Sequence, residues 1–504
     1  MLLPARLPLL MEFGGTLRPA MLFHSQPFIL GFLPLCLAGF FLLGRFAEPA
    51  WALRWLLACS LFFYGWWKPE FVLLLAGSIL ANYALAGRIR RAAAHSPPAA
   101  RRWLAAGIAF NLALLAWFKY ADFLLHMVAP QAPGLHIFLP LAISFFTFQQ
   151  IMFLAGNASG ECTECGLLHY ATFVAFFPHL IAGPIVRPRD IIPQLAARSV
   201  AIPRVDNLSA GLLLFLIGLA KKLVLGDTFG CFADTGFNAA ALGAPLSFVE
   251  AWYAALAYGL QIYFDFSGYS DMAIGLARML NVDFPVNFAS PYQARNIAEF
   301  WRRWHITLGW FLRDYLYIPL GGSRCSPARR TLNLVATMLL CGLWHGAAWS
   351  FVLWGGLHGV YLVLHRAWPV RLPYAAAQML TLLAVTIAWV PFRADGLHTA
   401  WSMLRGMAGS NGIALPQLIV QAVPPIGWIA TPVPVLPFLG DARTLSFPEV
   451  SACLLLGWFI VLAMPSVQTL PVKARHWAVT ASFAFSLQAL FFAPHVTPFL
   501  YFRF

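Results

Sequence analysis

The stretch Phe300–Ser350, FWRRWHITLGWFLRDYLYIPLGGSRCSPARRTLNLVATMLLCGLWHGAAWS, decides the fold class of this chain. Its first part is rich in arginine and carries His305, whereas the part from Leu332 onward is an apolar run that has no charged residue and contains His345. The two histidines are 40 residues apart (345 − 305). An ionisable side chain deep in an apolar membrane segment is costly and is usually functional. The histidine pair is therefore the first candidate for a functional site.

The same apolar character extends over the whole chain. Of its 504 residues 60% are hydrophobic and 10% are charged, and the mean hydropathy is +0.72. These values exclude an ordinary soluble globular protein and predict an all-α polytopic integral membrane protein. Windows long enough to cross about 30 Å of hydrocarbon lie at 27–44, 50–67, 70–87, 103–121, 135–155, 168–186, 208–226, 247–265, 331–350, 351–367, 376–392, 451–465 and 476–493. We therefore expect a bundle of roughly 11 to 13 transmembrane helices, with interfacial and re-entrant helices among them.

The net charge of +14 follows from short arginine-rich loops between the apolar windows. The clearest of them is the segment 87–102, which has no acidic residue and contains Arg88, Arg90, Arg91, Arg101 and Arg102. By the positive-inside rule this segment is cytoplasmic, and counting back from it places the N-terminus outside. The distribution of the positive charge therefore indicates that the partner is membrane lipid and that the chain does not bind nucleic acid.

We expect four regions along the chain. Residues 1–20 contain Pro4, Pro8 and Pro19 and lack the pattern of a cleaved signal peptide, so they form an N-terminal extension, and Met21 is a plausible alternative start. Residues 21–405 form the membrane core. The proline-rich residues 406–450 form an extramembrane connection, because prolines break spanning helices. Residues 451–504 form the C-terminal helices and an aromatic tail.

The spacing of the cysteines does not predict a metal site. Cys162 and Cys165 form the one close pair among eight cysteines, and neither a second such pair nor a histidine pair with metal-ligand spacing accompanies them. We therefore expect no metal ion and free thiols.

The periodicity around His305 predicts an amphipathic helix at a membrane interface. From Ala298 to Asp314 the aromatic and apolar side chains recur at helical spacing, and Glu299 and the arginines fall mostly on the other side. His305 is then on or beside the aromatic face. An interfacial histidine that is hydrogen-bonded to a backbone carbonyl is the alternative interpretation.

His345 has a different setting, because it lies 13 residues after Leu332 in an uncharged window. At 1.5 Å per residue, that distance is about 20 Å into a layer about 30 Å thick. Burial disfavours the imidazolium, so a neutral ring would be able to accept a proton from a hydroxyl group. A packing histidine that a neighbouring helix satisfies is the alternative.

Several motifs resemble the membrane-bound O-acyltransferase (MBOAT) family, and within it the bacterial branch that contains the alginate O-acetyltransferase membrane subunit. They are FFPHLIAGPI (176–185), QIYFDFSGYSDM (261–272), EFWRRWH (299–305), LRDYLYIPLGG (312–322) and GLWHG (342–346). The matches cover most of residues 21–410. One departure follows Phe148-Gln149-Gln150, where the family usually has an aspartate-tyrosine-arginine turn and this chain has FLAGN (153–157).

The resemblance implies the fold and the site. It implies an MBOAT-like bundle around a central tunnel, with His345 as the catalytic histidine and His305 as the second active-site position. It also implies a thioester acyl donor, acetyl-CoA or a similar acyl thioester, that arrives from the cytoplasm as a substrate rather than as a tightly bound cofactor. The expected location is the bacterial inner membrane.

The residues around the histidines fit such a donor. A thioester has a good leaving group, since a thiol has a pKa near 8.5, so the main task is to activate a hydroxyl group, for which a buried neutral imidazole is a suitable base. His305, or the indole N–H of Trp304 or Trp344, is expected to hold the substrate or the oxyanion. The donor's phosphates would meet a basic cluster beside the exposed backbone donors of Gly321-Gly322-Ser323. The cluster consists of Arg302, Arg303, Arg313, Arg324, Arg329 and Arg330, for which an ordinary positive-inside role is the alternative.

The C-terminus FLYFRF (499–504) has a single hydroxyl, that of Tyr501, among aromatic side chains. Such an ending is typical of an interfacial aromatic anchor. It also resembles the FxYFxF tail of this branch, which implies that Tyr501 carries the acyl group to an extracytoplasmic partner, an SGNH-like acetyltransferase within a polysaccharide export and modification complex.

The sequence therefore predicts an acetyl transfer toward an exported polysaccharide, with alginate as the first choice of polymer. Cellulose, peptidoglycan or another envelope glycan would leave nearly the same membrane sequence. Two alternatives come from other classes: a proton-coupled transporter or flippase in which the histidines relay protons, and a catalytically silent scaffold of the export machinery.

Overall fold

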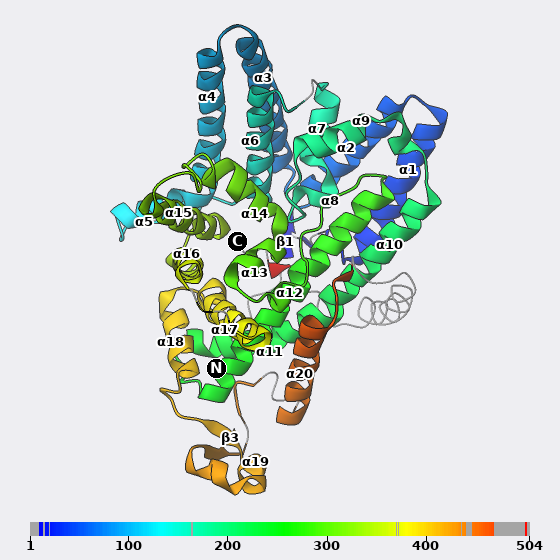
Figure 1. Ribbon diagram of the computed structural model, residues 1–504. Coiled ribbons are helices and arrows are strands. Elements are labelled where there is room, and N and C mark those ends of the chain that lie inside the picture. Colours follow the sequence, from blue (N-terminus) through cyan, green and yellow to red (C-terminus); the bar gives the residue numbers. More distant parts are fainter. Residues whose placement is uncertain are drawn as a thin grey trace. The chain divides into compact units, whose positions relative to one another are not determined.

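The computed structural model describes residues 10–13, 16–19, 21–162, 165–368, 370, 372–434, 436–439, 446–467 and 499–500. The described chain is overwhelmingly helical, as the apolar composition predicts (Figure 1). It forms two compact units. Unit 1 comprises residues 1–220, 268–286 and 472–503, and unit 2 comprises residues 221–267, 287–471 and 504. Each unit is described by itself below.

Unit 1 begins with an antiparallel pair of short strands, in which Leu10 is paired with Pro19 and Phe13 with Thr16. The other regular elements described in unit 1 are helices. The elements are β1 (Leu10–Phe13), β2 (Thr16–Pro19), η1 (Pro27–Phe32), α1 (Leu33–Phe46), α2 (Pro49–Gly65), α3 (Glu70–His95), α4 (Pro97–Leu115), η2 (Ala116–Tyr120), α5 (Ala121–Val128), α6 (Ile143–Ser159), α7 (Leu167–Ala175), α8 (Phe177–Leu180), α9 (Pro188–Ala196), η3 (Arg198–Ala201) and α10 (Val205–Ala220).

Helices α3, α4 and α6 stand side by side in unit 1 (Figure 1). Buried amides join them: Asn111 Nδ2 donates to Asn82 Oδ1 over 2.6 Å, and Asn82 Nδ2 also contacts Gln150 Oε1. Ser78 Oγ donates to the same Gln150 oxygen over 3.1 Å. In apolar surroundings an unpaired amide is costly, so these bonds fix which faces of the three helices meet.

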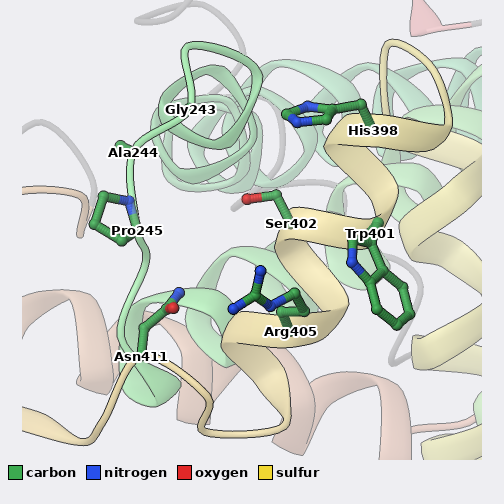
Figure 2. A pocket seen from close by; sticks show the side chains of 8 residues that line it. All are labelled: Gly243, Ala244, Pro245, His398, Trp401, Ser402, Arg405 and Asn411. Carbon is green, nitrogen blue, oxygen red and sulfur yellow. The ribbon is translucent and has the colours of Figure 1, made fainter.

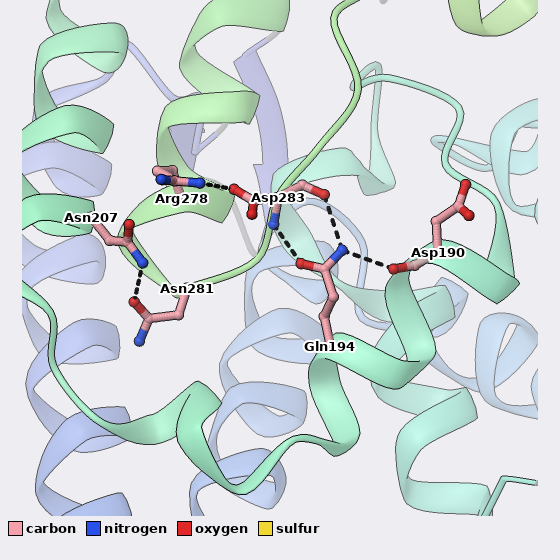
Figure 3. A network of polar contacts seen from close by, with 6 residues as sticks. All are labelled: Asp190, Gln194, Asn207, Arg278, Asn281 and Asp283. Atoms are coloured by element: carbon pink, nitrogen blue, oxygen red, sulfur yellow. Dashed lines mark hydrogen bonds and ion pairs between the residues drawn. The ribbon is translucent and has the colours of Figure 1, made fainter.

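The long helix α12 (Phe248–Met279) passes from unit 2 into unit 1 after Ser267. Its C-terminal end is held by a polar network within unit 1 (Figure 3). Asn281, at φ +59°, accepts from Asn207 Nδ2 over 2.7 Å, and Gln194 Oε1 accepts from the Asp283 N–H over 2.8 Å. Asp283 also pairs with Arg278. Helices α9 and α10 are thereby tied to the turn that follows α12.

Unit 2 contains the segment that holds both candidate histidines. Its elements are η4 (Lys221–Gly226), α11 (Asp227–Ala241), the first part of α12, η5 (Pro291–Gln293), α13 (Ile297–Arg303), α14 (Ile306–Leu312), η6 (Arg313–Tyr317), α15 (Pro327–His345), α16 (Trp349–Ala367), α17 (Tyr374–Arg393), α18 (Leu397–Met407), β3 (Ala414–Pro416), α19 (Gln417–Ala422), η7 (Pro424–Trp428), β4 (Thr431–Val433) and α20 (Phe447–Ala463). Strands β3 and β4 pair in parallel.

A buried ion triad joins η4 to α12 in unit 2. Lys222 Nζ lies 2.6 Å from Asp265 Oδ1 and 2.7 Å from Asp227 Oδ1. Asp265 belongs to the YFDFSG motif, and Gly226 lies close beside its backbone. Buried charges persist where they are paired, so the triad sets the position of the π-helical turn η4 against α12.

Helices α15 and α16 form an antiparallel hairpin with very close backbones. A Cβ atom at Gly342 would overlap the carbonyl oxygen of Phe351, and one at Gly355 would overlap that of Met338. Glycine at these positions permits the approach, as the small-residue spacing of Gly355 and Gly359 indicates. The hairpin turn, residues 346–348, directly follows His345.

Five helical stretches in the described part of the chain are long and apolar enough to cross a membrane. They are Pro27–Phe46, Glu70–His95, Pro97–Val128, Val205–Ala241 and Tyr374–Arg393, and each contains one of the expected windows. Six further windows correspond to helices α2, α6, α12, α15, α16 and α20. The window 476–493 lies outside the described residues.

Some boundaries differ from those that hydropathy predicts. The expected span 168–186 is wrong, because α7 ends at Ala175 and is followed by the one-turn helix α8. The window 331–350 is not one helix, because α15 ends at His345 and Gly346 is extended. The segment 87–102, which is predicted to be a cytoplasmic loop, is mostly helical, with only Ser96 between α3 and α4. Mean hydropathy does not reveal where a helix is interrupted.

Candidate functional site

His305 lies at a break between two helices of seven residues each, α13 and α14. The expectation of one amphipathic interfacial helix across Ala298–Asp314 is therefore wrong. The backbone N–H of Ile306 donates to Asn287 O over 3.0 Å, and that of Thr307 donates to Asn287 Oδ1 over 3.3 Å. Neither N–H therefore forms the hydrogen bond that it would form in a continuous helix. His305 itself adopts φ +43° and ψ +54°. A non-glycine residue in this region indicates a position that its surroundings hold in place.

Asn287 fixes the tautomer of His305. Because the Thr307 N–H donates to the side chain of Asn287, the atom it reaches is the amide oxygen and not the nitrogen. The Thr307 hydroxyl donates to the same oxygen over 2.9 Å, and His305 Nδ1 lies 3.1 Å from it. An oxygen of this kind can only accept, so Nδ1 carries the proton and Nε2 carries the lone pair.

The His305 ring is fully buried, at 0% exposure. Phe266 meets it edge-on with 4.7 Å between ring centroids, and Phe288 lies 6.5 Å away. This junction is outside the five spanning stretches. Burial lowers the pKa of His305 to about 3, so the ring is neutral at physiological pH.

His345 ends α15 and is 4% exposed. Its ring is enclosed by aromatic side chains: Trp354 and Phe392 each have a ring centroid 5.1 Å away, and Trp344 one at 4.8 Å. These residues come from α15, α16 and α17. The histidine is thus buried, as expected, but at the end of a helix rather than inside one.

Trp344 links the two histidines. Its ring lies 4.8 Å from that of His345 and 6.5 Å from that of His305. Two imidazoles 40 residues apart in sequence thereby face one aromatic side chain in unit 2. Trp304 is buried beside His305 but packs against Phe300, with 5.6 Å between ring centroids. Of the two predicted indoles, Trp344 is the one that contacts both histidines.

The predicted phosphate-binding cluster is only partly available to a ligand. Arg303 pairs with Glu299 over 2.7 Å, and Arg313 forms a two-bond pair with Asp314. Arg302 and Arg324 are exposed. Arg329 is exposed as well, and among the described residues none of these three arginines forms an ion pair.

The glycine turn is where exposed backbone donors are expected. The Gly321 N–H donates to Ile318 O over 3.0 Å, and the Gly322 N–H donates to Tyr317 O over 2.9 Å. Ser323 Oγ bonds the Tyr317 hydroxyl over 3.0 Å. Two of the three expected backbone donors, those of Gly321 and Gly322, are therefore used within the turn itself.

The family model for MBOAT, the membrane-bound O-acyltransferase family, matches residues 47–394. The matched range contains both histidines, Trp344 and Asn287. The chain belongs to the MBOAT family. It is therefore an O-acyltransferase and a multi-pass membrane protein, and the transporter and scaffold alternatives are set aside.

The names of similar proteins refer to three different polymers, peptidoglycan, alginate and teichoic acid. A peptidoglycan O-acetyltransferase of Helicobacter pylori is 42% identical and aligns with 80% of this chain and 82% of its own length. A probable alginate O-acetylase AlgI of Pseudomonas aeruginosa is also 42% identical, over 77% of this chain and 75% of its own. A teichoic acid D-alanyltransferase of Streptococcus thermophilus is 30% identical over 45% of this chain and 57% of its own length.

The MBOAT tail residue Tyr501 lies outside the described residues. Its neighbour Phe499 is described and is buried in unit 1. The Phe499 ring meets Tyr269 edge-on at 4.5 Å and His24 at 4.7 Å. An anchored segment thus directly precedes the predicted relay tyrosine.

Periodicity and composition did not identify Asn287 as part of this MBOAT site. The residue lies in the irregular segment between α12 and α13, where neither helical periodicity nor charge marks it. The structure alone reveals its complete burial, which requires that its side chain be hydrogen-bonded. His358 is also fully buried, and its Nδ1 accepts from Trp301 Nε1 over 3.2 Å.

Proposed function

We propose that this MBOAT protein moves an acetyl group from a cytoplasmic thioester donor, acetyl-CoA or a similar acyl thioester, across the bacterial inner membrane for O-acetylation of an exported polysaccharide. The observation that carries the proposal is the pair of buried histidines, His305 and His345, whose rings lie 6.5 Å and 4.8 Å from that of Trp344. Family membership supplies the reaction class, and this pair supplies the chemistry.

His345 is the proposed general base. It takes the proton of the acceptor hydroxyl, whose oxygen attacks the thioester carbonyl carbon. The carbon–sulfur bond then breaks, the thiolate leaves, and the new carbon–oxygen bond is that of an ester. An aromatic enclosure excludes water from the reacting atoms, and a positioned base contributes about 10²- to 10⁴-fold.

His305 is the proposed positioning residue for the substrate. Because Asn287 holds the proton on Nδ1, the Nε2 lone pair accepts a hydrogen bond from an N–H or O–H group of a substrate. A neutral ring in this tautomer does not donate from Nε2. The oxyanion is therefore assigned to another donor, and the Trp344 indole N–H is the proposed one.

Tyr501 is the proposed first acceptor. Its hydroxyl, with a pKa near 10, is more acidic than that of a sugar and is easier to activate. The acetyl-tyrosine then passes the group to an extracytoplasmic partner, an SGNH-like acetyltransferase of a polysaccharide export and modification complex. The support for this assignment is the resemblance of FLYFRF (499–504) to the FxYFxF tail of this branch.

The test of the reaction uses the full chain in membranes, labelled acetyl-CoA and three variants. His345→Ala is expected to abolish acetyl transfer, and His305→Ala to reduce it strongly. His365→Ala is the matched control, since that histidine is exposed at the end of α16 and should leave transfer unchanged. Normal transfer in His345→Ala, with the protein folded and membrane-inserted, would contradict the proposal.

Alginate is the proposed polymer, and peptidoglycan is the alternative, because relatives named for each are 42% identical to this chain. If alginate is the acceptor, the exopolysaccharide loses its ester groups when the gene is deleted, and if peptidoglycan is the acceptor, the peptidoglycan loses them. Measuring base-labile acetate on purified exopolysaccharide and on purified peptidoglycan from the same deletion strain decides between them. Unchanged acetate on both polymers would refute acetylation of either one and would leave cellulose or another envelope glycan as the acceptor.

A further inference from the structure

A pocket of about 220 Å³ lies in unit 2 between α18 and the loop after α11 (Figure 2). Its walls are formed by Gly243, Ala244, Pro245, His398, Trp401, Ser402, Arg405 and Asn411. None of these residues belongs to the acyl-transfer site, and none is acidic. Since one water occupies about 30 Å³, the space accommodates a small polar group rather than a single solvent molecule.

One face of α18 supplies the polar wall. His398, Ser402 and Arg405 have i, i+4 and i+7 spacing, which places them along one side of the helix. Figure 2 shows all three side chains directed toward the loop that contains Gly243 and Pro245. A guanidinium, an imidazole and a hydroxyl therefore meet in one hollow, which is the donor set that binds anionic oxygens.

The opposite wall is held in place by its own hydrogen bonds. Asn411 Nδ2 donates to Leu246 O over 2.8 Å, and the Phe248 N–H donates to Gly412 O over 3.0 Å. The Ala244 N–H donates to Ala239 O, also over 3.0 Å. These bonds tie both loops around the pocket to each other and to α11, so the hollow is preformed.

The surroundings of the pocket are apolar and exposed. Leu242 is 81% exposed, Leu397 48% and Trp401 63%. In Figure 2 the Trp401 indole lies on the side of α18 that faces away from the loop. Exposed leucine and tryptophan beside cationic groups are typical of a surface at the boundary between lipid tails and headgroups.

The pocket lies at the end of unit 2 away from the arginines that precede α15. Helix α15 starts at Pro327, shortly after Arg324, α16 returns and ends at Ala367, beside Arg366, and α17 starts at Tyr374 and leads to α18. Arginine-rich ends are cytoplasmic by the positive-inside rule. The pocket is accordingly on the extracytoplasmic side, where no cytoplasmic nucleotide or coenzyme reaches it.

We propose that this pocket binds the phosphate of an anionic phospholipid headgroup in the outer leaflet. Arg405 and Ser402 donate to the phosphate oxygens, His398 adds a third contact, and the acyl chains lie along Leu397 and Trp401. The apolar rim favours a lipid over a soluble phosphate or a sugar acid, because a soluble ligand gains nothing from exposed leucine and tryptophan.

The test is native mass spectrometry of the full-length protein from mild detergent, titrated with dioleoyl phosphatidylglycerol. The wild-type protein is expected to retain one lipid with higher affinity than the rest, and Arg405→Gln to weaken that site about tenfold or more, the loss of a charge-assisted contact. Ser402→Ala should weaken it less. Dioleoylglycerol, which lacks the phosphate, is expected not to occupy the site.

Arg366→Gln is the matched control, because it removes the same charge from an exposed arginine at the other end of the unit. It should leave the high-affinity site intact. Equal weakening by Arg366→Gln and Arg405→Gln would mean general surface charge only and would overturn the proposal. Retention of dioleoylglycerol as strong as that of phosphatidylglycerol, or displacement of the lipid by inorganic phosphate alone, would overturn it as well.

Discussion

Replacing Asn287 tests whether the buried amide controls His305. Asn287→Ala removes the oxygen that accepts from His305 Nδ1 and from both donors of Thr307. The tautomer of His305 is then no longer fixed, and the break between α13 and α14 loses the two hydrogen bonds from Thr307 that help to hold it. Asn287→Asp keeps an accepting oxygen in the same place but adds a negative charge beside the ring. The two variants therefore separate loss of positioning from a change in proton affinity.

The magnitudes follow from the geometry. A buried donor left without an acceptor costs about 1–3 kcal/mol, so Asn287→Ala is expected to lower acetyl transfer about 10- to 100-fold. In Asn287→Asp the carboxylate and the imidazolium would be about 4 Å apart, which is worth about 4 kcal/mol at an effective dielectric constant of 20. At 1.36 kcal/mol per pKa unit, the pKa of His305 rises from about 3 to about 6.

The sign of the pH effect is set by this rise. Wild-type His305 stays neutral throughout the physiological range, whereas in Asn287→Asp it becomes charged as the pH falls below about 6 and loses its Nε2 lone pair. The ratio of variant to wild-type kcat/KM, measured with labelled acetyl-CoA in proteoliposomes between pH 5 and 8, approximately the His titration range, should be constant above that point and fall below it.

Thr307→Val is the control, since it removes the hydroxyl donor but leaves the contact between Asn287 and His305 Nδ1. Its activity should stay within about twofold of wild type. Full activity of Asn287→Ala, or a ratio for Asn287→Asp that does not change with pH, would refute the assignment of Asn287 as the residue that sets the His305 tautomer.

Three further predictions concern the hairpin, the ion triad and the tail. Gly342→Ala is expected to lower the thermal stability in detergent by about 1–3 kcal/mol through overpacking, while Gly356→Ala, whose Cβ meets only a leucine methyl at 3.5 Å, should be nearly neutral; equal melting temperatures would contradict this. Lys222→Met leaves Asp265 buried without its cation and should cost about 3–5 kcal/mol, part of which Lys222→Met with Asp265→Asn restores; a double variant no more stable than the single one would show that the charges are not coupled. Tyr501→Phe should abolish polymer acetylation in cells, and an acetylated C-terminal peptide should be found by mass spectrometry only in the wild type; unchanged acetylation of the polymer would exclude the relay.

Some features of the site could be read from residue order. The uncharged window around His345 predicts a buried histidine because burial of an apolar segment depends mainly on composition. The motifs around His305 and His345 identify the family because each motif is a run of consecutive residues. The spacing of Gly355 and Gly359 likewise predicts a close helix pair, which α15 and α16 form.

Other features depend on contacts between distant segments. The break at His305 arises because Asn287, 18 residues earlier, accepts the N–H groups that a continuous helix would have used. Periodicity counts only neighbours three and four residues apart and predicts one helix there. The exposed donors predicted at the glycine turn after Pro319 also depend on such contacts. The N–H groups of its two glycines donate to Ile318 and Tyr317 within the turn.

The sequence by itself determined that this protein is an all-α membrane acyltransferase with two candidate histidines, because hydropathy and local motifs are written in consecutive residues. Only the tertiary structure decided that Trp344 faces both histidines and that Asn287 holds the proton on His305 Nδ1. Each of these facts is a distance between side chains from separate turns or helices. Such distances are set by packing and by the demand that every buried polar atom finds a partner, and neither is visible in the order of residues.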